Sequence, residues 1–209
     1  MSKWNDLFAD GGTHTNPTPD LEKLIPYLKS QGIVKILDEG CGNGRDTIYL
    51  AQQGFVVSAV DTSQTAIDVA KRNSVDLDID YRVCDLTNLP YQDETFDFVL
   101  AGHSLEYTGE DIAKCVSELG RVLKPAKPIY VRILSSNHPF SHKFQDRLYG
   151  NSVVGYAIQR DIPIKFFTVE EVRDLFRQFK IEKLNHIVHE PSKSTGVPLN
   201  EWVLLGYKK

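Results

Sequence analysis

Short apolar runs and longer amphipathic stretches alternate along the middle of the chain. Five apolar runs predict buried strands, at residues 33–37, 55–60, 79–84, 96–101 and 129–134. Helical spacing follows the first two runs, and another helical pattern precedes the fifth. Because strands that alternate with helices form parallel sheets covered by those helices, this part of the chain predicts an α/β core.

The segment before the core predicts an arm and one helix. Residues 1–32 begin with a polar stretch and continue into a helical pattern with Leu21 and Leu28 on its apolar face. Asp20 is expected to cap this helix, and Pro26 is expected to kink or limit it.

The segment after the core breaks the rhythm. Residues 135–167 are rich in aromatic and turn residues, and so long a connection in a compact domain is usually functional. Thr168 and Glu171 have the spacing of a capping box, which predicts the start of another helix. Two last apolar runs, at 181–188 and 202–207, predict strands.

Length and composition indicate one folded domain. A chain of 209 residues with 41% hydrophobic and 25% charged residues has the composition of an ordinary globular protein. We expect a single domain over residues 1–209 with four parts: the N-terminal arm and helix (1–32), the core (33–134), a variable cap (135–167), and a C-terminal helix and strand pair (168–209).

Charge and cysteine content indicate which binding partners and which redox compartment to expect. The net charge is −4 and Lys and Arg are scattered, so no basic patch predicts binding to nucleic acid. Cys41, Cys84 and Cys115 are odd in number and far apart, which favours a reduced, cytoplasmic setting over a disulfide framework. This spacing also excludes a local three-cysteine iron–sulfur motif. No apolar run reaches membrane-spanning length and no secretory signal is visible, so we expect no membrane association.

The junction between the first predicted strand and the following helix is rich in glycine. Asp38 ends the strand, and Gly40, Gly42 and Gly44 follow at alternate positions. Glycines here let backbone N–H groups approach a ligand, and the helix N-terminus adds unpaired donors. A dinucleotide fingerprint needs glycine at the sixth position, where this chain has Arg45. The loop therefore predicts a binding site for an anionic or polar ligand but leaves the class of nucleotide open.

Two more strands end in a carboxylate. Asp61 lies 17 residues beyond Gly44, where such a side chain can accept hydrogen bonds from both ribose hydroxyls of a nucleoside. The alternative is that Asp61 only caps the helix expected at 63–72. Asp85 follows the third strand in the same way.

The glycine spacing behind an acidic residue resembles the first motif of class I S-adenosylmethionine-dependent methyltransferases. The resemblance extends from Ile36 to Leu134, about half of the chain, with every element in order. It implies a doubly wound, mostly parallel seven-stranded sheet, the Rossmann-like methyltransferase fold, with an antiparallel strand pair at its edge. One departure is Lys124-Pro125-Ala126-Lys127, where the family usually carries Pro-Gly-Gly. Arg45-Asp46 and the Tyr-Leu-Ala that follows are weakly similar to tellurite-resistance-type methyltransferases.

The resemblance also implies a cofactor site for S-adenosylmethionine. The glycine loop would face the methionine part, Asp61 the ribose and Asp85 the adenine amino group, with Leu86 or Cys84 packing on the ring. The predicted cofactor-binding residues are Asp38, Glu39, Gly40, Cys41, Gly42, Asn43, Gly44, Arg45, Asp61, Thr62, Cys84, Asp85, Leu86, Ala101 and His103.

His103 is the best candidate for a catalytic residue. It follows the fourth predicted strand, next to the switch point where such sheets bind ligands, and its ordinary pKa suits a base. The alternative is a histidine that only packs beside the cofactor, and Glu106 and Tyr107 are weaker candidates. A base is needed only when the nucleophile arrives protonated. The loop lacks the Asn/Asp-Pro-Pro-Tyr motif of many amide and nucleobase methylases, which argues against those substrates.

The other histidines predict no metal site. Pro139 separates His138 from His142, and no carboxylate or cysteine completes a ligand set. We interpret His186 and His189, expected on opposite faces of a strand, as structural or exposed.

The function predicted from these observations is methyl transfer from S-adenosylmethionine to a small molecule. The acceptor pocket would be roofed by residues 135–167 and by the N-terminal arm. The aromatic residues expected there are Phe140, Phe144, Tyr149 and Tyr156, with His138 and Arg147 as polar anchors, and Trp4 and Phe8 as a lid or as simple packing. Two alternatives are a non-catalytic cofactor-binding or regulatory protein and a nucleotide-dependent oxidoreductase.

Overall fold

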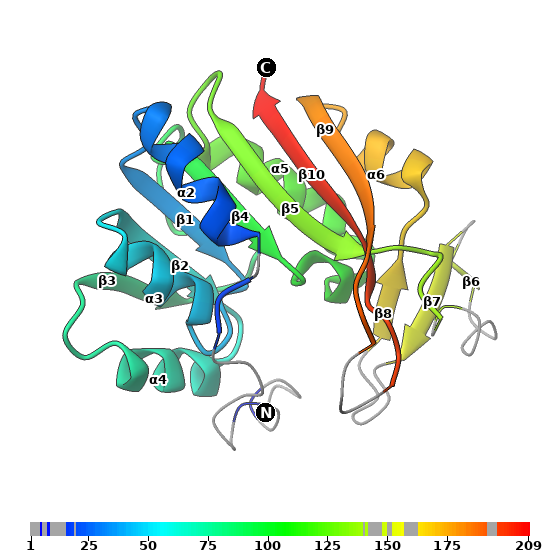
Figure 1. The fold of residues 1–209 in the computed structure, drawn as a ribbon, viewed down its shortest axis with the longest axis horizontal. Coiled ribbons are helices and arrows are strands. Elements are labelled where there is room, and N and C mark those ends of the chain that lie inside the picture. Colours follow the sequence, from blue (N-terminus) through cyan, green and yellow to red (C-terminus); the bar gives the residue numbers. More distant parts are fainter. Residues whose placement is uncertain are drawn as a thin grey trace.

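A seven-stranded sheet forms the centre of the protein, as the computed structural model shows (Figure 1). The structure describes residues 5, 8, 16–18, 20–139, 141, 148–149, 152–156, 163–191 and 196–209. The strand order is β3-β2-β1-β4-β5-β10-β9. The bounds are β1 (Lys35–Glu39), β2 (Val56–Asp61), β3 (Ile79–Val83), β4 (Phe98–Gly102), β5 (Pro128–Leu134), β9 (Phe179–Val188) and β10 (Asn200–Lys208).

The first five strands are parallel, and β10 is antiparallel to both β5 and β9. The predicted doubly wound, mostly parallel sheet with an antiparallel pair at its edge is therefore confirmed. Each predicted strand is present, with bounds that differ from the prediction by at most two residues.

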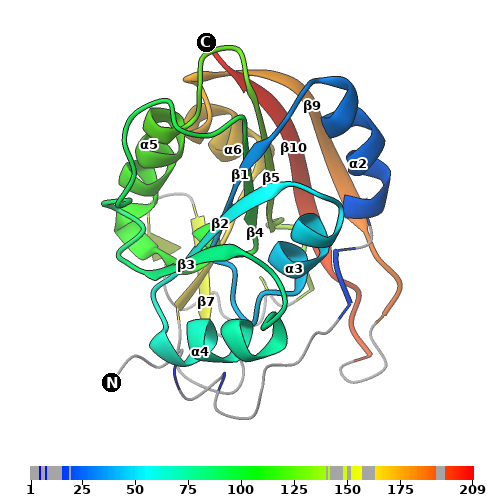
Figure 2. The ribbon, with the colours of Figure 1, turned by 90° about the vertical axis from the view of Figure 1, so that its left-hand side faces the viewer.

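Helices cover both faces of the sheet (Figure 2). One face carries α2 (Leu21–Ser30), α3 (Arg45–Gln52) and α4 (Gln64–Asn73), and the other carries α5 (Ile112–Val122) and α6 (Val169–Leu175). Leu28 of α2 and Leu50 of α3 are buried against Ile36 of β1 on the first face. Leu119 of α5 and Val172 of α6 are buried in the cluster that covers the second face. Alternate residues of each strand point to opposite faces, so both layers are apolar.

Two short 3₁₀ turns follow the fourth strand, and a small separate sheet follows the fifth. The 3₁₀ turns η1 (Leu105–Tyr107) and η2 (Gly109–Asp111) connect β4 to α5. A separate small sheet has the order β6-β7-β8, formed by β6 (Leu148–Tyr149), β7 (Ser152–Tyr156) and β8 (Pro163–Phe166). This sheet occupies the segment that the sequence predicts to be a cap.

The helix ends test the capping predictions. Thr168 and Glu171 form the predicted capping box at the start of α6. Asp20 occupies the predicted N-cap position of α2, but its side chain makes no capping hydrogen bond, and its Oδ1 instead accepts one from Lys23 (3.1 Å). Pro26 lies inside α2, which continues to Ser30, so it does not end the helix.

Candidate functional site

The glycine loop between β1 and α3 has the backbone shape that its sequence predicts. Gly40, Gly42 and Gly44 have φ angles of 68°, 54° and 83°, in the left-handed region that favours glycine. A Cβ on Gly40 would lie 2.2 Å from Cβ of Ser104, and one on Gly44 would lie 2.9 Å from Cβ of Ala70. Both glycines are therefore needed for close packing as well as for their backbone angles.

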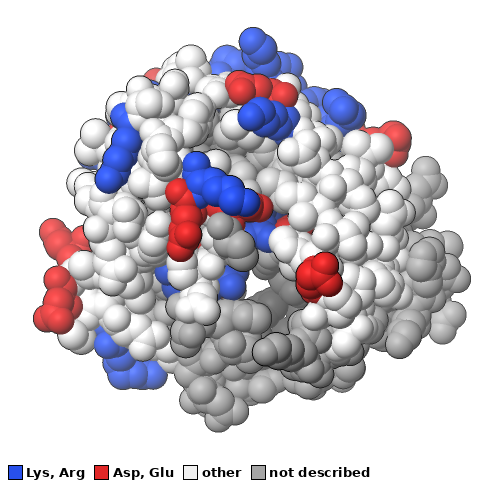
Figure 3. All heavy atoms as spheres, in the orientation of Figure 1, with Lys and Arg blue, Asp and Glu red and all other residues white. Residues whose placement is uncertain are grey.

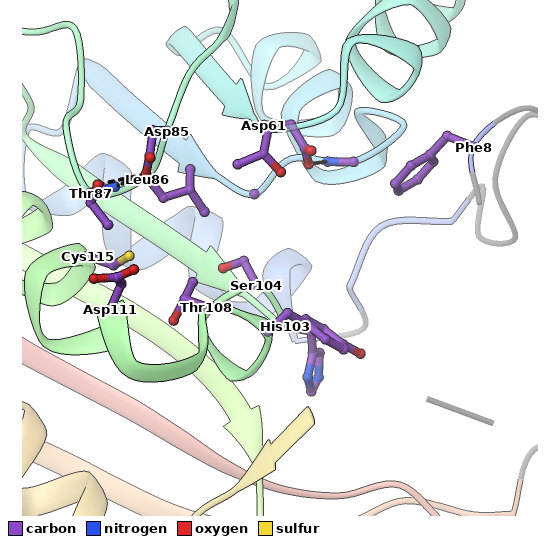
Figure 4. Close-up of a pocket in the computed structure, with 14 residues that line it drawn as sticks. Phe8, Asp61, Asp85, Leu86, Thr87, His103, Ser104, Thr108, Asp111 and Cys115 are labelled. Carbon is purple, nitrogen blue, oxygen red and sulfur yellow. Dashed lines mark hydrogen bonds between the residues drawn. The ribbon is translucent and has the colours of Figure 1, made fainter. Parts of the chain in front are cut away.

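A cavity of about 280 Å³ opens at the carboxyl ends of β1, β2 and β4 and beside the loop after β3 (Figure 4). Figure 4 shows Asp61, Asp85 and Leu86 on one side of it and Ser104, Thr108 and Cys115 on the other. Its lining consists of Phe8, Gly40, Gly42, Asp61, Thr62, Asp85, Leu86, Thr87, His103, Ser104, Tyr107, Thr108, Asp111 and Cys115. The structure thus brings together the glycine loop and both predicted carboxylates.

Asp61 connects the glycine loop to the end of β2. Its Oδ2 accepts a hydrogen bond from the backbone N–H of Gly42 and its Oδ1 accepts one from that of Ser63, both at 2.9 Å. Burial raises the pKa of Asp61, and these backbone hydrogen bonds act in the opposite direction. Ser63 supplies the side-chain cap of α4 by accepting from Ala66 N–H. Asp61 also lines the cavity, so its position is compatible with ligand binding as well as with support of this helix.

Asp85 lines the cavity, and one of its two carboxylate oxygens already accepts hydrogen bonds within the protein. Its Oδ1 accepts hydrogen bonds from the backbone N–H and the hydroxyl of Thr87, both at 2.8 Å, and these bonds lower the pKa of Asp85. Leu86 lines the cavity, whereas Cys84 packs against the cluster under α5. Of the two predicted apolar neighbours, Leu86 is the one placed to contact a bound ring.

Several predicted cofactor residues lie beneath the cavity instead of on its wall. Asp38 and Glu39 are buried, and their oxygens accept hydrogen bonds from the hydroxyls of Thr47 and Ser104. Arg45 donates to the hydroxyl of Thr18. The residues of the prediction that do not line the cavity are Asp38, Glu39, Cys41, Asn43, Gly44, Arg45, Cys84 and Ala101. These residues can shape the site from below.

His103 lies between two carboxylates. Its Nδ1 is 2.8 Å from Oε1 of Glu106, and its Nε2 is 2.9 Å from Oε2 of Glu201. Its φ angle is 59°, unusual for a residue with a Cβ. Burial lowers the pKa of His103, but the two carboxylates outweigh that effect and raise it to about 9. The arrangement favours the charged imidazolium, so His103 is a weaker base near neutral pH than the sequence alone indicates.

Glu201 is the centre of a buried ionic group. It forms an ion pair through both oxygens with Arg132 of β5, and its Oε1 also contacts Nε2 of His189. Glu201 is 0% exposed, and Arg132 is 4% exposed. Burial raises the pKa of Glu201, but His103 and Arg132 outweigh that effect and lower it. The sequence carries one hint of this pair, because Arg132 and Glu201 are charged residues within apolar strands.

The N-terminal arm reaches the cavity at Phe8. A Cβ on Gly42 would lie 3.1 Å from Cζ of Phe8, so the ring lies directly over the loop. Oδ1 of Asn5 accepts hydrogen bonds from the hydroxyl of Ser63 (2.7 Å) and from the N–H of Thr65 (3.3 Å). Trp4, the other aromatic residue of the predicted lid, lies outside the described residues.

The predicted acceptor wall is only partly described. Phe140, Phe144, Arg147 and His142 lie outside the described residues, and Tyr149 and Tyr156 are described in their backbones alone. His138 is buried with its ring 5.5 Å from that of Phe166, and burial lowers its pKa.

The other histidines have structural contacts. The ring of His186 packs 4.8 Å from that of Trp202. His189 follows the end of β9 and contacts Glu201, so it is not on the strand as predicted. Among the residues that the structure describes, no group of three His, Cys, Asp or Glu side chains could hold a metal ion.

Surface charge and helix length are the features relevant to binding of nucleic acid and to crossing of a membrane. On the face seen in Figure 3, Lys and Arg alternate with Asp and Glu instead of forming a basic patch over its described part. In the described part of the chain, no helix is both long and apolar enough to cross a membrane.

Comparisons with known proteins agree with the fold. Residues 37–131 match a family model described as a methyltransferase domain. A ubiquinone biosynthesis O-methyltransferase of Coxiella burnetii is 27% identical over 146 residues, covering 66% of this chain and 62% of that protein. The chain thus matches somewhat less than two thirds of the length of this curated relative.

Solved structures share the whole architecture. A protein described as a SAM-dependent methyltransferase from Methanosarcina mazei has a TM-score of 0.76 at 21% identity, covering 92% of this chain and 98% of its own. TehB from Haemophilus influenzae has a TM-score of 0.68 at 16% identity, covering 99% of this chain and 67% of its own. At these identities the likeness shows the fold alone. The chain therefore matches a methyltransferase domain over residues 37–131 and has the fold of proteins described as SAM-dependent methyltransferases.

Proposed function

We propose that this protein transfers the methyl group of S-adenosylmethionine to a small-molecule acceptor by in-line displacement. One observation carries the proposal: a single cavity combines the glycine loop with Asp61 and Asp85, two carboxylates at the ends of neighbouring strands. Such a set suits an adenosine cofactor, because it offers hydrogen-bond acceptors for hydroxyl and amino groups beside a loop without Cβ atoms.

The residues that line the cavity offer a partner for the ribose, the adenine amino group and the adenine ring of that cofactor. Asp61 would bind the ribose hydroxyls with the lone pairs that Gly42 and Ser63 leave free. Oδ2 of Asp85 would accept from the adenine amino group while Thr87 fixes the other oxygen. Leu86 and Cys115 would provide apolar contact for the ring.

The bound cofactor supplies an activated methyl group with its own leaving group, so the protein has to position and enclose the reactants. Phe8 from the N-terminal arm is placed to exclude water above the glycine loop. His103 remains our candidate for the group that accepts a proton from the acceptor. Because its pKa is raised to about 9, only the minor neutral form could do so at pH 7.

The acceptor class is supported by relatives of similar sequence. Their names specify ubiquinone biosynthesis O-methylation and ubiquinone/menaquinone biosynthesis C-methylation. A solved structure of the same fold is named for N1-methylation of a didemethyltoxoflavin. We therefore propose a small aromatic or heteroaromatic acceptor, held on the side of the cavity lined by His103 and Tyr107.

A transfer assay tests the proposal. The protein is incubated with methyl-labelled S-adenosylmethionine and a panel of phenols, quinols and heteroaromatic compounds, and product mass is measured. The proposal expects a gain of one methylene group in an acceptor and formation of S-adenosylhomocysteine. Tight cofactor binding without turnover of any acceptor would favour the non-catalytic alternative. Calorimetric binding of NAD without binding of S-adenosylmethionine would favour the oxidoreductase.

A further inference from the structure

Glu39 is a carboxyl group sealed beneath the cofactor loop. It is the last residue of β1, directly before Gly40, and it is 0% exposed. Its Oε2 accepts a hydrogen bond from Oγ of Ser104 (2.6 Å). Its Oε1 is buried and has no hydrogen-bond partner among the described residues. A negative charge in such a place is costly unless a cation compensates it.

The groups around Glu39 come from every element that packs against it, and most of them are acidic. Asp38 precedes it on β1, Asp61 ends β2, and Glu106 lies in η1. The thiols of Cys84 after β3 and Cys115 on α5 are also close enough to interact with its charge. His103, the residue before Ser104 in the sequence, is engaged with Glu106 and Glu201.

These surroundings favour the protonated form of Glu39 in the free protein. Burial raises the pKa of Glu39 most, and the hydrogen bond from Ser104 lowers it. Asp61, Asp38 and Glu106 raise it further, and the balance lies at about 8. A cation that entered the cavity above Ser104 would change this balance, because an opposite charge favours the ionised carboxylate.

The cofactor and the product of the reaction differ in charge. S-adenosylmethionine carries a sulfonium cation, and S-adenosylhomocysteine has an uncharged thioether in its place. We propose that Glu39 makes the site prefer the cofactor to the product, by releasing its proton to solvent when the sulfonium binds and retaining it when the thioether binds. This inference rests on the proposed function only for the identity of the cofactor, and the acceptor plays no part in it.

Two consequences follow from linkage between ligand and proton binding. Binding of S-adenosylmethionine should release up to about three quarters of a proton at pH 7.5, where a carboxyl with a pKa of about 8 is still mostly protonated, and should strengthen as pH rises toward 8. Binding of S-adenosylhomocysteine should release much less and should vary less with pH over that range. After methyl transfer the sulfur is uncharged, so Glu39 regains a proton and the product is held less tightly.

Calorimetry of the full chain tests the proposal. Each ligand is titrated at pH 7.5 in two buffers with different protonation enthalpies, which gives the number of protons released. A third ligand, an analogue with a protonated amine in place of the methylated sulfur, separates the effect of charge from that of the methyl group. We expect proton release with S-adenosylmethionine and with the amine analogue, and little with S-adenosylhomocysteine.

Glu39→Gln is the decisive variant, because it keeps the shape of the side chain and removes its charge. It should abolish most of the proton release and weaken S-adenosylmethionine binding roughly tenfold, the equivalent of about one pKa unit. Affinity for S-adenosylhomocysteine should stay within about threefold, which also shows that the variant is folded. Glu22→Gln, on the exposed side of α2, is the matched control and should change neither quantity.

Equal proton release with both natural ligands in the unaltered protein would overturn the proposal, even if Glu39→Gln failed to fold. Unchanged proton release in a folded Glu39→Gln variant would overturn it as well. Either result would leave methyl transfer untouched. Lack of turnover with every acceptor would instead defeat the proposed function and leave the binding result standing, and failure to bind either ligand would defeat both.

Discussion

Oε2 of Glu201 on β10 lies 2.9 Å from Nε2 of His103 at the end of β4, although the two residues are far apart in the sequence. The same carboxylate pairs with Arg132 of β5. A carboxylate on the antiparallel strand β10 thus acts on the charge of a histidine that lines the cavity beside the parallel strands. This relationship makes the protonation of His103 depend on a residue that lies outside the family motifs.

Glu201→Gln should lower the pKa of His103 from about 9, because a carboxylate that stabilises the imidazolium is removed. The shift can be measured by NMR titration of labelled histidine, with His103→Asn to assign the signal. If His103 is the base, the rise of kcat/KM with pH should move to lower pH in the same variant. The variant also leaves Arg132 without its buried partner, so its melting temperature should fall by several degrees.

Glu182→Gln on β9 is a suitable control, since Glu182 is exposed and makes no ion pair among the described residues. An unchanged His103 signal in folded Glu201→Gln would show that the 2.9 Å contact does not set the protonation of His103.

The charge of His103 also predicts how stability depends on pH. The pKa of His103 is about 9 in the folded protein and about 6.5 in an unfolded chain. Its contribution is therefore fully present below pH 6.5 and is lost as pH rises toward 9. Subtracting the unfolding free energy of His103→Asn from that of the parent, between pH 6 and 9.5, isolates this contribution. The difference should shrink with rising pH, and a constant difference would contradict the raised pKa.

Much of the fold follows from the sequence because it depends on local pattern. The glycines between β1 and α3 and the carboxylates Asp61 and Asp85 occur where strands end, and parallel strands bring those ends to one edge. The pair of Arg132 and Glu201 could not be predicted, since it requires the register of β10 on β5. Ser104 and Cys115 reach the cavity through the packing of η1 and α5, which no local pattern specifies.

Asp61→Ala should weaken S-adenosylmethionine binding by about 1.5–3 kcal/mol, the scale for hydrogen bonds to a charged group. It should also lower the melting temperature, because Asp61 holds the N–H groups of Gly42 and Ser63. Calorimetric titration and thermal unfolding measure the two effects. Asp61→Asn keeps one acceptor oxygen, so its loss of stability should be smaller than its loss of affinity for S-adenosylmethionine. Parental affinity in Asp61→Ala would remove Asp61 from the binding site.

Gly40→Ala should destabilise the protein and impair cofactor binding. The new Cβ would be 2.2 Å from Cβ of Ser104, so the loop or η1 must move. Gly54→Ala is a matched control, since Gly54 also has positive φ (91°) but nothing within 4 Å of its Cβ position. Urea unfolding should show a loss of about 1 kcal/mol for the control from backbone strain alone and about 1–3 kcal/mol more for Gly40→Ala. Equal losses would mean that the contact with Ser104 relaxes freely.

Ala126→Gly should stabilise the protein, which is unusual for a substitution by glycine. Ala126 has a φ angle of 56°, and it stands in the turn before β5 where related methyltransferases usually carry glycine. An L residue with a Cβ pays about 1–2 kcal/mol for this conformation, and glycine avoids it at a smaller cost in the entropy of the unfolded chain. The side chain is exposed, so little packing is lost. We expect a gain of up to about 1 kcal/mol in urea unfolding, with cofactor affinity unchanged because the turn is remote from the cavity.

Ala113→Gly, on an exposed position of α5 with helical backbone angles, should instead lose about 1 kcal/mol. A loss of similar size in Ala126→Gly would show that the turn does not strain its alanine.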